Sequence, residues 1–288
     1  MKLVLPTESS LLEAVRVLVP GTSNRTLRQM LDRGRVRLNG LPAKVASRRL
    51  VPGDLVEITP HAVPSPALHG IIIAFEDEAL LLVEKPAGLL TVATEHERQR
   101  TAFAFLLRYL KAHNSKQRLF IVHRLDKFAS GVLVFAKSQS IQAQLKNMFS
   151  RHDIQRKYWA IVEGRVNPEH GTIRSYLAEN RAQRMHSTAD PAAGKEAITH
   201  FRVLRRFPQL TSLEVTLETG RKNQIRVHLS EFGHPIVGDQ AYGSRVNPLG
   251  RLGLHASLLG FNHPVHGARI LHKTKIPPEF IRYLPVTG

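Results

Sequence analysis

One carboxylate, Asp126, stands in a short polar block between two apolar runs, in IVHRLDKFASGVLVFAKS over residues 121 to 138. Gly131 opens a run that predicts a buried strand, so we expect Asp126 on a loop beside a rigid sheet. A carboxylate in that place can serve as a general base or as a nucleophile. An Asp between apolar runs is also typical of a turn or a cap, so other segments must decide.

Three more side chains have types suited to chemistry on a nucleotide. Tyr158, in RKYWAIVEG, has a ring that can stack on a base and a hydroxyl, although a half-buried strand aromatic is the plainer interpretation. Arg124 has a planar guanidinium that can stack on bases and bond phosphate; its alternative is an ordinary salt bridge. Arg226, in GRKNQIRVHL, lies on a helix predicted to begin near Asn223.

Five blocks together resemble one family, the RluA-type pseudouridine synthases, across residues 70 to 270. Around HRLDKFASG stand DEALLLVEKPAGLLTV, RKYWAIVEG, TLETGRKNQIRVHLSEFGHPIVGDQAYG and RLGLHASLLGFNHP. The resemblance implies an enzyme that isomerises uridine to pseudouridine in structured RNA, with Asp126 as catalytic carboxylate and Arg226 as its partner. It also implies that Tyr158 meets the freed uracil and that Arg124 fills the place of the flipped uridine. Whether Asp126 attacks the base, attacks C1′ or deprotonates the ribose stays open.

The sequence departs from the family pattern at three positions near these residues. Ala129 replaces the usual Thr, Arg156 the usual Lys, and Asn223 the usual His before Gln-Ile-Arg. None of them replaces the carboxylate, so we expect activity and leave substrate choice open. The matching histidines have plain structural explanations and are left out of catalysis: His228, His234 and His255.

The chemistry implied by the resemblance needs no cofactor. The N1 to C1′ bond is broken and the base is rejoined through C5, with no net redox change. The chain has no Cys, which excludes disulfides and thiolate zinc sites. The His263-Pro-Val-His266 pair has metal-like spacing, but no second ligand pair, Asp/Glu cluster or HExxH accompanies it in the sequence, and we expect no metal site.

Basic charge predicts a polyanionic partner. The 288 residues include 41 Lys and Arg against 23 Asp and Glu, a formal net charge of +18. Residues 21 to 50 hold eight basic residues and one acidic one, in a predicted helix and hairpin that resemble the S4 RNA-binding domain. A solvated charged face is the plain alternative. The candidate RNA-binding residues in this segment are Arg25, Arg28, Arg33, Arg35, Arg37 and Lys44. Arg124, in the predicted catalytic domain, is a further candidate.

Local patterns predict the elements that position these residues. Residues 1 to 60 are expected to form a small α/β S4-like domain, with a capping box at Ser10 and Glu13, a helix end at Gly34 and a turn at Asn39-Gly40. Proline-rich residues 61 to 68 are expected to be a linker. In residues 69 to 288, short apolar runs alternate with helical patterns, which predicts a mixed α/β or α+β body. The family resemblance implies the α+β class, with a mixed and largely antiparallel central sheet and flanking helices.

These observations favour a monomeric, cytoplasmic RNA pseudouridine synthase that acts on ribosomal RNA, more specifically the large-subunit RNA, rather than tRNA. No run approaches the roughly 20 apolar residues of a membrane span, so a membrane partner is not expected. Two alternatives remain. One is a catalytically silent S4-type RNA-binding factor, and the other is an RNA N-glycosidase, which would also flip a nucleotide but would lower the mass of the RNA.

Overall fold

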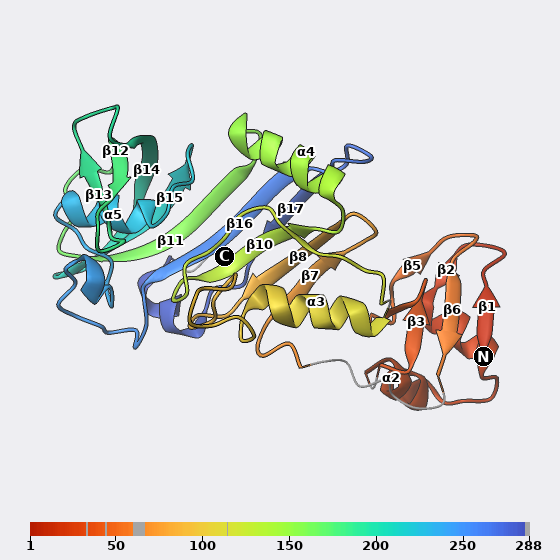
Figure 1. Cartoon of the computed structure of the whole chain (residues 1–288). Helices are drawn as coiled ribbons and strands as arrows, with labels where there is room; N and C mark the ends of the chain where they lie inside the picture. The colour runs from red at the N-terminus through yellow and green to blue at the C-terminus, as the bar shows by residue number, and fades with distance from the viewer. Residues whose placement is uncertain (33, 44, 60–66, 114, 286–288) are drawn as a thin grey trace. The chain divides into compact units, whose positions relative to one another are not determined.

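The structure is a computed structural model that describes residues 1–32, 34–43, 45–59, 67–113 and 115–285 (Figure 1). It divides into two compact units, residues 1–67 with 105–118, and residues 68–104 with 119–288. The proposed linker falls largely outside the described residues, and the predicted domain boundaries stay a prediction. In the described part of the chain, no helix has both the length and the apolar character needed to cross a membrane.

The N-terminal elements belong to the first unit, and two local signals within them lie where the sequence predicted. Ser10 caps the first helix, and its hydroxyl and the Glu13 carboxylate complete the expected capping box. Gly34 follows the second helix with a φ of +66°, the left-handed conformation that favours glycine at a helix end. Four strands pair in the order β1-β6-β3-β4, and β2 pairs with β5. The elements are β1 (Lys2–Val4), β2 (Ser9–Ser10), α1 (Leu11–Leu18), α2 (Asn24–Asp32), β3 (Val36–Leu38), β4 (Leu41–Pro42), β5 (Arg49–Leu50) and β6 (Leu55–Ile58).

The second unit is built on one large sheet with helices beside it (Figure 1). Its path is β13-β12-β14-β15-β11-β16-β10-β8-β7, with β17 paired to β16 and β9 to β10. Its elements are β7 (Ile72–Glu76), β8 (Leu80–Lys85), α3 (Ala102–His113, which crosses the boundary between units), β9 (Phe120–Ile121), β10 (Ser130–Ala136), α4 (Gln139–Ser150), β11 (Gln155–Glu163), β12 (His170–Glu179), β13 (Met185–Thr188), β14 (Lys195–Arg206), β15 (Leu210–Leu217), α5 (Gln224–Glu231), η1 (Gln240–Tyr242), β16 (Leu254–Asn262), β17 (Arg269–Lys273) and η2 (Pro278–Tyr283).

The pairing of β10 with β16 is parallel, whereas the other ladders of this sheet are antiparallel. The predicted α+β class with a mixed, largely antiparallel sheet is therefore confirmed. Gly131 allows the parallel contact, because it has a φ of +114° and a Cβ built there would lie 2.2 Å from the Ala256 carbonyl oxygen. Any larger residue would push β10 away from β16, and with it the loop that carries Asp126.

Candidate active site

Two buried side chains fix the loop that presents Asp126. Lys85, 1% exposed at the end of β8, donates from Nζ to the carbonyl oxygens of Lys127 at 3.2 Å and Ala129 at 2.6 Å. On the other side, Thr91 Oγ1 donates to the Leu125 carbonyl at 2.7 Å and accepts from its N–H at 3.2 Å. The backbone is therefore held immediately before and after Asp126.

The side chain of Lys85 also influences the electrostatics around this loop. Burial lowers the pKa of Lys85 to about 7, against the opposing effect of the Asp126 charge, while Arg251 lowers it further. Nζ reaches two more carbonyls, those of Pro86 at 2.9 Å and Leu89 at 2.7 Å. Four oxygen acceptors compensate for the loss of water around the ammonium. We therefore interpret Lys85 as the support of the loop rather than a group that meets a ligand.

Asp126, Tyr158 and Arg226 line one small pocket although they lie far apart in the sequence. It has a volume of about 60 Å³ and includes the exposed Arg124. Pockets that take small ligands usually measure roughly 300–1,000 Å³. A nucleotide can therefore enter only if lining side chains move. Arg124 is exposed and forms no ion pair with a described carboxylate, so no such pair holds its side chain in place. The lining residues are Arg124, Leu125, Asp126, Ala129, Tyr158, Leu217, Arg221, Asn223, Gln224, Ile225, Arg226 and Leu254.

The guanidinium of Arg226 bonds two carboxylates unequally. Its Nε and Nη2 donate to the two oxygens of Asp239 at 2.7 and 2.8 Å, a bidentate pair in which the Asp239 side chain is 2% exposed. Its Nη1 lies 3.4 Å from Asp126 Oδ2. The expected contact with Asp126 is present, but the principal ion pair is with Asp239, which the sequence analysis did not identify. Burial lowers the pKa of Arg226, but the bonds and charge of Asp239 outweigh it and give a net raised pKa.

Asn223 and Tyr242 complete the surroundings of Arg226. Asn223 adopts a left-handed φ of +55° at the start of α5, and its Oδ1 accepts from Arg226 Nη1 at 3.1 Å. Its Nδ2 donates to the Tyr242 hydroxyl at 3.0 Å, and the Tyr242 ring lies 4.7 Å below the guanidinium carbon. Asn tolerates the left-handed region better than most residues. This departure from the family pattern thus has a local role in orienting the arginine.

Tyr158 lies on β11 and is 8% exposed. Burial raises its pKa, which the Arg156 charge opposes and the Asp126 charge reinforces, so the hydroxyl is protonated at neutral pH. It makes no hydrogen bond with a described residue. The phenol is therefore an available O–H group facing the pocket.

Arg156, two residues before Tyr158, is a buried cation with no described carboxylate within ion-pair distance. Its Nη2 donates to the carbonyls of Leu217 at 3.3 Å and Glu218 at 2.8 Å, and its guanidinium lies 5.1 Å from the Phe149 ring centroid. Burial lowers its pKa. A Cβ at Gly220 would lie 2.8 Å from Nη1, so this glycine leaves the space that the larger head group occupies. Arg156 thereby fastens the end of β15, which borders the pocket.

The missing hydroxyl at Ala129 makes the loop less polar without releasing it. Ala129 is 2% exposed and its carbonyl accepts from Lys85. The neighbouring Ser130 keeps its hydroxyl, which bonds His255 Nδ1 at 2.6 Å and accepts from Arg251 Nη2 at 2.5 Å. Ser130, His255 and Arg251 do not line the pocket, so these polar contacts lie outside it.

Histidines near the site have structural partners. Burial lowers the pKa of His228 to about 4, against a small opposing effect of Glu231, and it bonds Thr199 and Ser175. Burial, together with the charge of Arg251, lowers the pKa of His255 to about 3. Burial, helped by Arg156, likewise lowers that of His123 to about 3, and its Nε2 accepts from the Val134 N–H at 3.1 Å. His234 bonds the Glu163 carbonyl through Nδ1.

The candidate RNA-binding residues of the first unit have different surroundings. Arg25 and Arg28 are exposed on α2 and form no ion pair with a described residue. Arg35 donates from Nε to the Thr59 carbonyl at 3.0 Å, and the Nε of Arg37 is buried without a partner. Arg33 and Lys44 lie outside the described residues. Arg25 and Arg28 are thus the two whose guanidinium groups are placed to meet a phosphate.

The His263 and His266 pair meets Asp77 at the β16 to β17 turn, with one ligand atom from each residue within 4.8 Å of the others. His263 Nε2 bonds Asp77 Oδ2 at 2.8 Å, and Nδ1 accepts from the Val265 N–H. The two rings are stacked 3.7 Å apart with planes 1° from parallel. An imidazole binds an ion in its own plane, and parallel planes do not meet. This arrangement therefore fits a turn support better than a shared ion.

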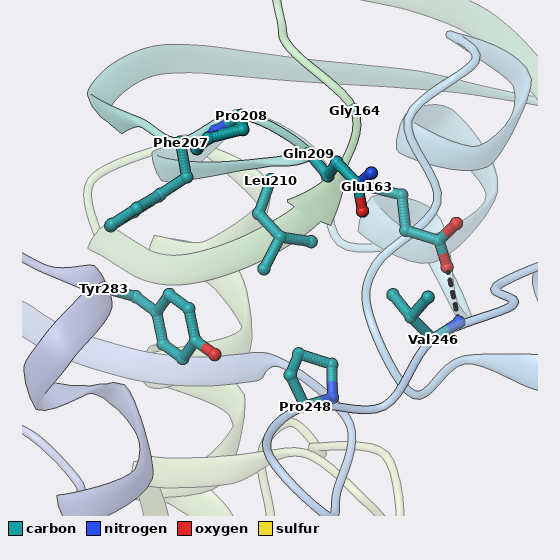
Figure 2. A pocket seen from close by; sticks show the side chains of 9 residues that line it. All are labelled: Glu163, Gly164, Phe207, Pro208, Gln209, Leu210, Val246, Pro248 and Tyr283. Atoms are coloured by element: carbon teal, nitrogen blue, oxygen red, sulfur yellow. Dashed lines mark hydrogen bonds between the residues drawn. The ribbon is translucent and has the colours of Figure 1, made fainter.

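A larger pocket, of about 670 Å³, lies at the other end of β11 and β15. Figure 2 shows its mainly apolar wall and Glu163, whose Oε1 accepts from the Val246 N–H at 3.1 Å. Tyr158 and Glu163 are five positions apart on β11, an odd offset, so their side chains point to opposite faces of the sheet. The larger volume of this pocket therefore does not by itself make it the candidate active site. The lining residues are Glu163, Gly164, Phe207, Pro208, Gln209, Leu210, Val246, Pro248 and Tyr283.

Comparison with known proteins decides the family. The model of the family described as RNA pseudouridylate synthase matches residues 79–231, which hold both Asp126 and Arg226. This chain belongs to that family. It is an RNA pseudouridine synthase of the RluA type, an isomerase whose substrate is RNA.

Individual relatives cover nearly the whole chain. An uncharacterized RNA pseudouridine synthase of Bacillus subtilis, YlyB, is 35% identical over 272 residues, covering 89% of this chain and 87% of the relative. Ribosomal large subunit pseudouridine synthase D of Escherichia coli K12 is 30% identical over 292 residues, covering 95% and 89%. The solved structure of human RNA pseudouridylate synthase domain containing 4 is 26% identical, with a TM-score of 0.60, covering 73% of this synthase and 90% of that chain.

Proposed function

We propose that this synthase modifies uridines of large-subunit ribosomal RNA and uses Asp126 as its catalytic carboxylate. The observation that carries the proposal is the meeting of Asp126, Tyr158 and Arg226 at one pocket, from segments up to 100 residues apart. Relatives named ribosomal large subunit pseudouridine synthase D support this RNA over tRNA. The enzyme is proposed to act as a monomer in the cytoplasm.

The loop geometry supports a division of roles. Asp126 is held on both flanks by Thr91 and Lys85, so its carboxylate can meet the ribose or base at a defined position. Arg226 contacts that carboxylate from one side while Asp239 keeps the guanidinium in place. The protonated hydroxyl of Tyr158 is suited to hold the freed uracil and to relay the C5 proton. Preorganised groups of this kind need little rearrangement in the transition state.

Entry of the substrate requires the target uridine to leave its stack, at a cost of a few kcal/mol. The pocket of about 60 Å³ cannot hold a nucleotide while Arg124 lies at its edge. We assign Arg124 to move outward and take the vacated place in the RNA, where its planar group can stack and bond phosphate. The S4-like first unit, with Arg25 and Arg28 exposed on α2, is proposed to bind phosphates of the same RNA.

Pseudouridine mapping in ribosomal RNA from cells with and without this gene tests the proposal. We expect one or a few large-subunit positions to lose pseudouridine, and the purified enzyme to restore them in an unmodified transcript with no change in RNA mass. A loss of mass would support the N-glycosidase alternative. Unchanged positions in ribosomal RNA, with a loss in tRNA, would overturn the choice of substrate, whereas binding without any modification would support the silent factor.

A further inference from the structure

A second pocket, of about 570 Å³, adjoins the catalytic one. Arg221 lines both pockets, because the segment between β15 and α5 forms their common edge. Figure 1 shows β12, β13 and α5 close together in this part of the second unit. Its volume lies within the range of sites that take small ligands. We name it the flanking pocket; its lining residues are Leu177, Ala178, Glu179, Met185, Ala192, Ala193, Gly194, Lys195, Gly220, Arg221 and Lys222.

The flanking pocket carries positive charge that is largely uncompensated. Lys195 and Arg221 form no ion pair with a described carboxylate, although Arg221 Nε donates to the Glu196 carbonyl at 2.9 Å. Lys222 pairs with Glu179, and both side chains are well exposed, at 38% and 44%. An exposed pair of this kind contributes little to stability and exchanges readily for another anion. The pocket therefore offers three cations against one carboxylate.

Its floor and wall suit a flat apolar group. Leu177 and Met185 are 3% and 8% exposed and belong to a buried cluster with Val227 and Tyr242. The residues at 192 to 194 are Ala, Ala and Gly, so no long side chain fills the space. A Cβ at Gly194 would lie 2.8 Å from Thr188, so this glycine lets the turn pack closely. None of the described residues that line the pocket is aromatic, so a base would rest on the apolar floor by contact alone, while the cations at the rim bind its phosphate.

We infer that the flanking pocket binds the ribonucleotide next to the target uridine on the same RNA strand. The inference rests on the proposed catalytic pocket at Asp126. When the uridine is flipped into that pocket, the adjacent nucleotide is one backbone step away, and Arg221 lines both pockets, so this nucleotide can reach the flanking pocket. Binding of the neighbour would hold the flipped strand and let the synthase distinguish sequences around its target.

Two kinds of variant test the flanking pocket in the full-length enzyme. Lys195→Gln and Lys222→Gln each remove one cation, and each should lower the slope of log Kd against log salt by about 0.7 for a short single-stranded RNA of random sequence. Glu179→Gln should tighten binding, because it frees Lys222. Lys273→Gln, at an exposed position on β17, is the control for loss of charge elsewhere. Equal slopes in all four variants and the wild type would overturn the inference.

Crosslinking then places the bound nucleotide. Unmodified large-subunit RNA transcribed with 4-thiouridine is irradiated with the wild-type enzyme, and crosslinked peptides are identified by mass spectrometry. We expect peptides covering residues 189–195 or 220–222 to carry the nucleotide adjacent to the modified uridine, and Ala193→Trp, which fills the pocket, to abolish that crosslink. Crosslinks from distant nucleotides alone would contradict the inference. If the wild type modifies no uridine in this RNA, the proposed substrate fails, and the salt slopes still decide whether the pocket binds RNA.

Discussion

Arg226 is bonded more closely to Asp239 than to Asp126. Both Asp239 oxygens accept from the guanidinium at 2.7 and 2.8 Å, whereas the nearer Asp126 oxygen lies at 3.4 Å. The Asp239 side chain is 2% exposed and that of Asp126 is 22% exposed. Asp239 thus positions the arginine, and the remaining Nη1 is shared between Asn223 and Asp126, the proposed catalytic carboxylate. The two carboxylates that bond Arg226 therefore differ, because Asp239 is buried and holds the guanidinium whereas Asp126 is more exposed and more distant.

Double-mutant cycles on thermodynamic stability should separate these two contacts. Arg226→Met leaves Asp239 buried without its partner, and breaking such a pair commonly costs about 3–5 kcal/mol. We expect strong coupling, above roughly 1 kcal/mol, between Arg226→Met and Asp239→Asn. Coupling between Arg226→Met and Asp126→Asn should be smaller, because that contact is longer and more exposed. Urea unfolding of the six chains measures both; greater coupling with Asp126 would reverse the assignment.

Tyr158→Phe tests the phenol separately from the fold. The hydroxyl bonds no described residue, so its removal should change the free energy of unfolding by less than about 1 kcal/mol. The ring remains, and RNA affinity should stay within a few-fold of wild type. Pseudouridine formation should nevertheless fall by at least about 100-fold if the O–H relays a proton, the usual range for such groups. Full single-turnover activity would reduce Tyr158 to a packing residue.

Acid should destabilise the synthase because three buried imidazoles are neutral in the folded state. Burial lowers the pKa of His228 to about 4 and those of His123 and His255 to about 3. The unfolded chain takes up these protons near pH 6.5, so stability present above pH 6.5 is lost as the pH falls toward 4. Each contributes a slope of about 1.4 kcal/mol per pH unit in that window.

Urea unfolding at pH 7, 6 and 5 measures this dependence. His228→Gln keeps groups that can bond Thr199 and Ser175 but removes one group that titrates. The slope of its free energy of unfolding against pH should therefore be smaller by about 1.4 kcal/mol per pH unit, the contribution of one proton. A free energy of unfolding that does not change between pH 7 and 5 would contradict the burial of these rings. So would an equal slope in the variant and the wild type.

Local sequence signals identified elements well. The capping box at Ser10 and Glu13 marked the start of α1, and the run opening at Gly131 identified the buried strand β10, which begins one residue earlier, at Ser130. Both rest on interactions within a few residues or on one residue's conformational freedom, which sequence displays directly. The order of strands in the large sheet depends on contacts between distant segments and was not predicted; the resemblance implied only a mixed, largely antiparallel sheet.

The supports of the site were not predicted, for the same physical reason. Lys85 is separated by 42 and 44 residues from the loop carbonyls that it bonds, and its place in EKPAG resembles an ordinary charged strand end. Asp239 stood within a quoted block, VGDQAYG, but nothing local indicated that it would meet Arg226. A charged residue after an apolar strand, inside a block that carries a family resemblance, is the signal that could have drawn attention to both.

Exposed arginines on α2 should contribute to RNA binding through phosphate contacts. Arg25→Gln together with Arg28→Gln should lower the slope of log Kd against log salt by about 1.4, at roughly 0.7 for each lost contact with single strands. Lys2→Gln is the matched control, since Lys2 lies in the same unit and already pairs with Glu57. Fluorescence anisotropy over a salt series gives the slopes. An unchanged slope in the double variant would remove α2 from the RNA-binding surface.

The role of Asp126 is tested most directly by single-turnover release of tritium from RNA labelled at C5 of uridine, since rejoining the base through C5 displaces that atom. The substrate is an unmodified large-subunit transcript with enzyme in excess. Asp126→Asn keeps the size of the side chain and removes its charge. We expect no release above background from the variant, with RNA affinity within a few-fold of the wild type. Measurable turnover by Asp126→Asn would contradict the assignment of Asp126 as the catalytic carboxylate.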